Sequence, residues 1–262
     1  MFKTLLGLLL ILALLYAALS AWVFFRQRDF IYFPQFTHAD LPPTNLELPV
    51  EDVVLRGWVV NPGKRDAVIY FGGNAEPVQA MRAELAQWFP GHSSYLVAYR
   101  GYGASDGVPG ERALTADALA LYDLVRSRHR DGSITVIGRS LGSGVASHLA
   151  ARRPVARLVL VTPFDSMARL AQAHYSFLPV RWLLRDRYES ARHLRHYRGP
   201  VLIVRASNDR IVPVERTMQL AEALPVRPQV VALPGTDHNT LSYGPGYRQA
   251  IVDFVNRQDP PE

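Results

Sequence analysis

The sequence predicts an α/β domain with a mostly parallel sheet, preceded by an apolar N-terminal segment. From residue 50 onward, short β-branched runs alternate with stretches whose apolar residues recur at helical spacing. Most of the strand-like runs are continuously apolar, which is typical of strands that helices cover on both faces. Such alternation favours right-handed crossovers, so we expect the chemistry in loops at the carboxyl ends of the strands.

Composition narrows the class of protein. Its 262 residues suit one large domain plus a short appendage, and 48% of them are apolar, which provides for a substantial core. The net charge of +6 comes almost entirely from arginine, which fits attraction to a membrane or an acidic partner as well as coding bias. The chain has no cysteine, which excludes disulfides, thiol nucleophiles and thiolate metal sites.

The first predicted element is a membrane helix. Leu5–Phe25 is a run of 21 residues without a charge, which as a helix would cover roughly 30 Å, the thickness of a bilayer core. Trp22 and Arg26 stand where interfacial anchors are expected. A cleaved signal peptide is the alternative, because Ala18-Leu19-Ser20 resembles a cleavage site. The apolar run continues past that site, so we predict an uncleaved anchor.

The charges beside this segment say little about its orientation. Lys3 precedes it and Arg26 and Arg28 follow it, so the positive-inside rule only slightly favours a location of the following domain on the non-cytoplasmic side. We predict a bacterial inner membrane as the location. The predicted domains are an anchor at residues 1–28 and an α/β domain at 29–262, in which 165–199 form a short cap.

The remaining elements follow a connection that prolines interrupt. We expect that connection, which contains Pro34, Pro42, Pro43 and Pro49, to be irregular. The predicted strands are Val53–Val60, Ala67–Phe71, Ser94–Tyr99, Ile134–Ile137, Leu158–Val161, Val201–Arg205 and Gln229–Leu233. The predicted helices are Val78–Trp88, Leu114–Arg128, Leu141–Arg152, Glu215–Leu224 and Arg248–Val255.

A candidate nucleophile lies between a predicted strand and a predicted helix. Ile134–Ile137 runs directly into Gly138-Arg139-Ser140-Leu141-Gly142. A G-x-S-x-G string alone is weak evidence, but this context predicts a nucleophile elbow with Ser140 as the nucleophile. Glycines remove side chains that would clash in so tight a turn, and the helix N-terminus points N–H groups at a developing oxyanion. A glycine-rich turn that only packs the helix on the sheet is the alternative.

A serine nucleophile needs a base, and the loop after the last predicted strand contains His238. Of the eight histidines, His238 alone combines this position with the right chain order. His148 is expected to pack or to face solvent. His193 and His196 look like surface residues beside arginines rather than metal ligands, and no metal site is predicted.

The third member of the site is expected after the strand before the last, where Asp209 stands. There it would orient the ring of His238 and stabilise the imidazolium, although an Asp in a turn often only caps the next helix. Asp165 is the reserve candidate, and Asp237 is too close in sequence to reach the ring. The chain order of Ser140, Asp209 and His238 is the one expected with a nucleophile elbow.

Two backbone N–H groups are predicted to form an oxyanion hole. One is that of Leu141, directly after the nucleophile, and the other is that of Asn74 in Gly72-Gly73-Asn74-Ala75-Glu76. A plain turn is the alternative for the second loop. Arg100-Gly101-Tyr102-Gly103 also follows a strand, but it lacks the spacing of a dinucleotide-binding turn. No cofactor is predicted.

In combination, these residues resemble a branch of the α/β-hydrolase superfamily that includes bacterial membrane-anchored hydrolases and eukaryotic depalmitoylating hydrolases. The resemblance runs from about Phe30 to Val255 and includes the elbow. It also rests on Ile31-Tyr32-Phe33-Pro34, Gly73-Asn74-Ala75, the glycine-rich stretch from Tyr99 to Gly107, Pro163-Phe164-Asp165-Ser166, Asn208-Asp209-Arg210-Ile211-Val212-Pro213 and Asp237-His238-Asn239. The family usually has histidine-glycine-asparagine at Gly72-Gly73-Asn74, and often histidine-glycine at Arg205-Ala206; these departures concern substrate fit.

The chemistry predicted from these residues is cleavage of esters or thioesters by a serine hydrolase through an acyl-enzyme. The cap mixes many arginines with apolar Phe177-Leu178-Pro179-Val180 and Trp182-Leu183-Leu184. This composition fits acyl lipids presented near anionic headgroups, and it fits an ordinary solvated helix face equally well. The expected partners are a small-molecule or lipid acyl substrate and the membrane, and no nucleic acid. A serine peptidase of the same fold and a catalytically silent, membrane-bound interaction module are the alternatives.

Overall fold

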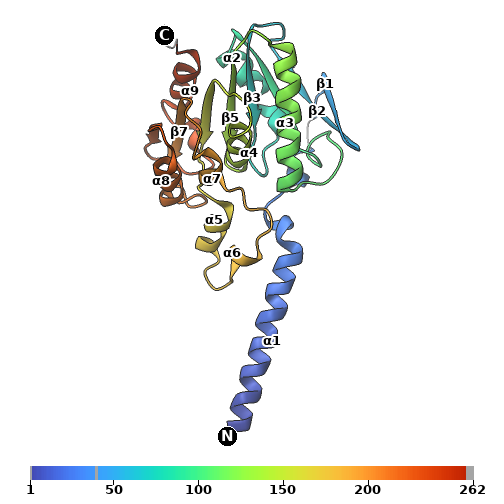
Figure 1. Cartoon of the computed structure of the whole chain (residues 1–262), viewed down its shortest axis with the longest axis vertical. Coiled ribbons are helices and arrows are strands. Elements are labelled where there is room, and N and C mark those ends of the chain that lie inside the picture. Colours follow the sequence, from blue (N-terminus) through green and yellow to red (C-terminus); the bar gives the residue numbers. More distant parts are fainter. Residues whose placement is uncertain (1, 39–40, 258–262) are drawn as a thin grey trace.

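The computed structural model describes residues 2–38 and 41–257, and its centre is one eight-stranded sheet (Figure 1). The strand order is β1-β2-β4-β3-β5-β6-β7-β8. β2 pairs antiparallel with β1 and β4, and every other pair is parallel. The strands are β1 Leu46–Val50, β2 Val53–Val60, β3 Asp66–Phe71, β4 His92–Val97, β5 Ile134–Arg139, β6 Arg157–Val161, β7 Val201–Ala206 and β8 Gln229–Leu233. The predicted mostly parallel sheet is confirmed.

One strand contradicts the sequence-based expectation. β1 lies within the connection that we expected to be irregular, and it contains Pro49. It pairs only with β2, at the edge of the sheet, where a residue without an N–H is tolerated. Proline content misled the prediction because it cannot distinguish an edge strand from a loop.

Helices cover both faces of the sheet, since β6, an interior strand, is buried along its whole length. α3, α4, α7 and α8 contact one another in that order, and α2 meets α9 through the rings of Trp88 and Tyr247. The α-helices are α1 Phe2–Arg26, α2 Arg82–Trp88, α3 Glu111–Arg128, α4 Leu141–Ala150, α5 Met167–His174, α6 Val180–Leu183, α7 Ser190–Leu194, α8 Val214–Ala223 and α9 Tyr247–Asn256. Short 3₁₀ helices are η1 Gln27–Phe30, η2 Pro34–Phe36, η3 Val78–Met81 and η4 Leu241–Tyr243. The five predicted helices are present with shifted ends, and α5, α6 and α7 lie in the predicted cap.

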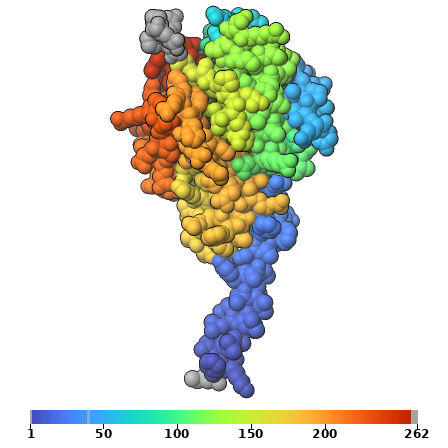
Figure 2. Space-filling view, viewed as in Figure 1, coloured from blue at the N-terminus to red at the C-terminus, as the bar shows by residue number. Residues whose placement is uncertain are grey.

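α1 projects from this body as a separate rod (Figures 1 and 2). None of its residues is buried, and its leucines are exposed along its length. By length and composition, it is the one helix in the described ranges that could cross a membrane, with a mean hydropathy of 2.5 in its most apolar window. A signal sequence would meet the same criteria. In Figure 1 the cap helices α5 and α6 lie below the sheet, and α6 lies beside the upper part of α1, with which it is in contact.

Candidate active site

Ser140 lies at the turn between β5 and α4, in a backbone conformation that few residues adopt. Its φ is 50° and its ψ is −115°, outside the favourable regions for a residue with a side chain. Its N–H donates to the carbonyl of Val161 on β6, which fixes the turn at the carboxyl edge of the sheet. Strain of this kind persists only where the surrounding structure maintains it, and it is common at functional sites.

The glycines around Ser140 are required by the closeness of neighbouring backbone. A Cβ on Gly138 would lie 2.4 Å from the carbonyl oxygen of Gly142. A Cβ on Gly142 would lie 2.2 Å from the carbonyl oxygen of Phe71 at the end of β3. Glycine at both positions therefore allows α4 to begin directly against the sheet, with its unpaired N–H groups beside Ser140.

The structure brings Ser140, His238 and Asp209 together from three separate loops. His238 Nε2 lies 3.0 Å from Ser140 Oγ, and His238 Nδ1 lies 2.8 Å from Asp209 Oδ2. The side chains of His238 and Asp209 are largely buried. The other carboxylate oxygen of Asp209 accepts the N–H groups of Ile211 and Val212. This arrangement can move a proton from the hydroxyl to the imidazole, because the ring is held on its far side by a carboxylate.

The loop after β3 places Asn74 beside this group. Phe33 N–H and the Tyr102 hydroxyl both donate to the Asn74 carbonyl, which fixes the peptide. Within the described ranges no group accepts a hydrogen bond from the Asn74 N–H, so this N–H is available. A cavity of about 240 Å³ opens at this point. It is lined by Gly73, Asn74, Ala75, Glu76, Pro77, Arg139, Ser140, His238 and Asn239.

Glu76 and Arg139 link the loops around the cavity, and sequence reasoning missed both. Glu76 accepts hydrogen bonds from the Gly73 N–H and from the hydroxyl of Tyr70 on β3. Its carboxylate lies 3.5 Å from Arg139, and Arg139 also donates to the carbonyl of His238. Burial, together with the negative charge of Glu76, raises the pKa of Tyr70 well above its ordinary value, so Tyr70 remains a donor. The only signal in the sequence was the place of both residues inside the two predicted site loops.

Comparisons with known proteins give the family and the fold of the chain. The family model described as serine aminopeptidase, S33, matches residues 63–189. An uncharacterized protein of Mycobacterium tuberculosis is 36% identical over 263 aligned positions, which span 94% of this chain and 92% of that protein. An α/β-hydrolase enzyme from a Medee basin deep-sea metagenome library has the same fold, with a TM-score of 0.66 at 13% identity over 83% of this chain and 99% of that chain. The chain belongs to the α/β-hydrolase family.

A named relative of this α/β-hydrolase is the lysophosphatidylserine lipase ABHD12 of Macaca fascicularis. It is 28% identical over 224 residues, covering 74% of this chain and 56% of that protein. The chain thus spans about half the length of this lipase. The family resemblance inferred from the motifs is confirmed, and esterase- or lipase-like relatives support a hydrolase.

Two other acids that we considered from sequence lie apart from the ring of His238. Asp165 is buried and forms ion pairs with Arg169 and Arg216, at 3.2 and 3.4 Å. Asp237 accepts the N–H groups of Asn239 and Thr240, and so builds the turn that carries the histidine. Both carboxylates of the hydrolase therefore have structural partners of their own.

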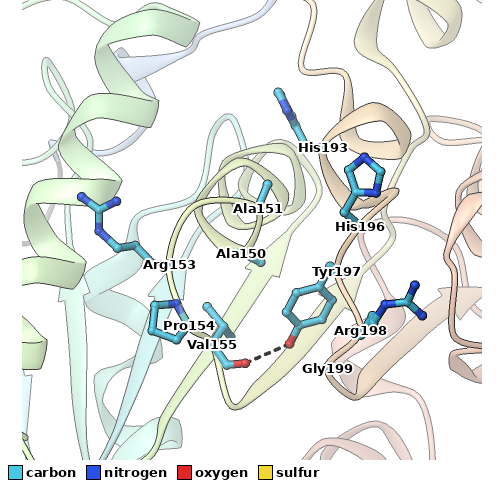
Figure 3. A pocket seen from close by; sticks show the side chains of 10 residues that line it. All are labelled: Ala150, Ala151, Arg153, Pro154, Val155, His193, His196, Tyr197, Arg198 and Gly199. Carbon is cyan, nitrogen blue, oxygen red and sulfur yellow. Dashed lines mark hydrogen bonds between the residues drawn. The ribbon is translucent and has the colours of Figure 1, made fainter.

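A second cavity, of about 320 Å³, lies between the end of α4 and the segment that leads to β7 (Figure 3). His193 and His196 stand at its rim, and the Tyr197 hydroxyl donates to the Val155 carbonyl. The ring of His193 packs edge-on against that of His148. In the part of the chain that the structure describes, no group of three or more potential ligands could hold a metal ion.

This histidine pair gives a testable pH dependence. Burial, with the charges of Arg152 and His193, lowers the pKa of His148 to about 4. An exposed histidine has a pKa of about 6.5, so between pH 6.5 and 4 His148 takes up a proton in the unfolded chain and stays neutral in the folded chain. The free energy of unfolding should therefore fall as pH drops through this window. Because the ring is partly exposed, we expect a loss on the order of 1 kcal/mol.

The measurement is the midpoint of denaturant unfolding at pH 7 and pH 4.5. His148→Gln should reduce the difference between the two, whereas the same change at exposed His196 should leave it unaltered. A difference as large in His148→Gln as in the unmodified protein would contradict the assignment.

Proposed function

We propose that the protein is a membrane-anchored serine hydrolase that cleaves ester or thioester bonds. The observation that carries the proposal is the 3.0 Å separation of His238 Nε2 from Ser140 Oγ, at a strained turn, with Asp209 on the other side of the ring. Chance packing rarely places a hydroxyl, an imidazole and a buried carboxylate in series at the carboxyl edge of a parallel sheet.

In the proposed reaction, His238 takes the proton of Ser140 as the oxygen attacks the acyl carbon. The N–H groups of Leu141 and Asn74 stabilise the oxyanion. His238 then gives the proton to the leaving alcohol or thiol, and an acyl-enzyme remains. Water, deprotonated by the same ring, releases the acid and restores the hydroxyl. Asp209 holds the ring in the useful tautomer throughout.

The substrate class follows from the anchor and from the relatives. In this proposal residues 1–28 form a single-pass anchor and the hydrolase domain begins at residue 29, with a cap over 165–199. α1 exposes its leucines along its length, and a bilayer would remove this apolar surface from water. The lysophosphatidylserine lipase relative acts on a lipid by its name, so acyl lipids are the proposed substrates. A bacterial inner membrane, with the catalytic domain on the non-cytoplasmic side, completes the proposal.

A peptidase is the second candidate, because the matching family model is described as a serine aminopeptidase. Nothing in a Ser-His-Asp arrangement separates amides from esters. Turnover of p-nitrophenyl esters, acyl thioesters and aminoacyl anilides by the purified protein distinguishes the two. Preference for the anilides would replace the lipid proposal by the peptidase one.

A fluorophosphonate probe tests the nucleophile directly. The unmodified protein should be labelled, and Ser140→Ala should not. Ser143→Ala is the matched control, since Ser143 is buried one turn further along α4. The Ser143→Ala protein should still be labelled. Absence of labelling in the unmodified protein would favour the catalytically silent interaction module, and labelling of Ser140→Ala would exclude this serine.

Glu76 is expected to act as a positioning residue. Glu76→Ala removes the acceptor that holds Gly73 and the carboxylate that pairs with Arg139. Because the loop that carries the Asn74 N–H then loosens, we expect kcat to fall about tenfold to a hundredfold with little change in KM. Steady-state kinetics on a soluble ester measure both constants.

The matched control removes a carboxylate from an exposed ion pair. Asp123→Ala breaks the contact with Arg153 and should leave kcat unchanged. A rise in KM at constant kcat in Glu76→Ala would mean that Glu76 binds substrate instead of positioning the loop.

A further inference from the structure

Part of the cap lies along the membrane helix. We call residues 175–185 the cap tip. The hydroxyl of Tyr16 on α1 donates to the carbonyl of Phe177, at 3.0 Å. Tyr16 lies almost three helical turns, about 15 Å, before Arg26 at the end of α1. The cap tip therefore extends beside the apolar part of α1 instead of stopping at its end.

The surface of the cap tip is aromatic. Tyr175, Phe177 and Trp182 are 48%, 64% and 78% exposed. Exposed aromatic side chains are common singly, but here they gather on one segment, next to a helix that is itself apolar and exposed. Trp and Tyr are the residues that favour the boundary between headgroups and acyl chains.

Arginines accompany the aromatic residues. Arg181 and Arg185 are exposed, and in the described part of the chain no carboxylate pairs with either. The guanidinium of Arg181 lies 5.7 Å from the ring centroid of Trp182, and that of Arg185 lies 5.8 Å from the ring centroid of Phe24 on α1. Unpaired cations beside aromatic rings are complementary to an anionic lipid surface.

Buried contacts fix the cap tip to the end of α1. The side-chain amide of Gln27 donates to the carbonyls of Phe24 and Leu183, and its oxygen accepts the N–H of Arg185. Next to it, Arg28 pairs with Asp186 at 3.0 Å. Since Gln27 and Asp186 are buried, the position of the cap tip along α1 is set by the fold.

We propose that the cap tip is a membrane-docking surface that enters an anionic leaflet beside α1. Phe177, at the level of Tyr16, reaches the acyl region, Tyr175 and Trp182 insert beside it, and Arg181 and Arg185 contact lipid phosphates. The inference rests on one part of the proposed function, that α1 spans a membrane. It goes further by placing the cap of the hydrolase in the lipid, so that a lipid substrate meets the cap before it leaves the leaflet.

The absence of cysteine allows a direct test, because single cysteines can be placed and spin-labelled in the full chain. Phe177→Cys and Trp182→Cys are reconstituted in vesicles of phosphatidylcholine with phosphatidylglycerol. We expect both labels to be relaxed by oxygen and shielded several-fold from a water-soluble nickel chelate. Val226→Cys is the matched control. Exposed Val226 precedes β8 and so lies at the amino end of the parallel strands, whereas the cap follows the carboxyl end of β6. The label at 226 should be open to the chelate.

Leu9→Cys, on α1, separates failure of the inference from failure of the anchor. A shielded label at 9 with labels at 177 and 182 as open as that at 226 would overturn the docking surface alone. A label at 9 open to the chelate would overturn the anchor and the docking surface together. Neither result depends on whether Ser140 reacts.

The lipid composition tests the arginines. Shielding at 182 should be greater in vesicles with phosphatidylglycerol than in phosphatidylcholine alone, and the double change Arg181→Gln, Arg185→Gln should remove the difference. Equal shielding in both kinds of vesicle would overturn recognition of anionic lipid.

Discussion

His238→Ala is expected to lower kcat/KM for an activated ester by a factor of about 10⁴ to 10⁶. The change removes the only imidazole within reach of Ser140 in the described ranges, where Nε2 lies 3.0 Å from Oγ. Without it the hydroxyl has no base and the leaving group has no acid. Ester turnover at saturating and low substrate measures the loss, and far-UV circular dichroism establishes that the variant folds.

The double variant Ser140→Ala, His238→Ala shows whether the two side chains act as a unit. Because each loss already disables the same step, the double variant should be no slower than the worse single variant. His196→Ala is the matched control, since this exposed histidine stands at the second cavity and should keep full activity. Activity of His238→Ala within tenfold of the unmodified protein would refute the proposed base.

Gly142→Ala is expected to cost about 3 kcal/mol or more of the free energy of unfolding and to abolish labelling of Ser140. Its Cβ would lie 2.2 Å from the Phe71 carbonyl oxygen and 2.7 Å from that of Gly72. Both are backbone atoms of the sheet edge and of the loop that carries Asn74, so α4 must move away from the sheet. The elbow and the loop after β3 would be displaced together.

Denaturant unfolding and fluorophosphonate labelling measure the two effects. Gly91→Ala is the matched control: a Cβ there meets nothing within 4 Å, and the φ of Gly91 is not positive. It should change the free energy of unfolding by less than about 0.5 kcal/mol. Gly142→Ala with normal stability and labelling would mean that the turn tolerates a side chain, contrary to its geometry.

Local sequence predicted much of the central sheet because burial on both faces demands continuous apolar residues. Val201–Arg205 and Leu158–Val161 are such runs, and both are strands within one residue of the predicted bounds. The elbow was predictable for a related reason: strand, glycine, serine, glycine and helix are consecutive, so one short window contains the whole constraint. The positions of Asp209 and His238 followed from chain order, but their distances to each other and to Ser140 did not.

The contacts that surround the site depended on residues far apart in the chain. No residue near Glu76 in sequence indicates that Glu76 pairs with Arg139. Gln27 bonds to Leu183 and Arg185, which are more than 150 residues away in the chain. β1 was missed because the edge of a sheet tolerates Pro49, and which strand forms the edge is a property of the whole sheet.

The sequence by itself determined the α/β class, the apolar N-terminal helix and the identity of the candidate nucleophile, because each depends on short-range periodicity, length or turn chemistry. Only the tertiary structure decided how the loops converge, which carboxylate faces His238, and that the cap tip lies against α1. The physical reason is that hydrogen bonds and ion pairs between distant segments form only after the sheet has brought those segments together.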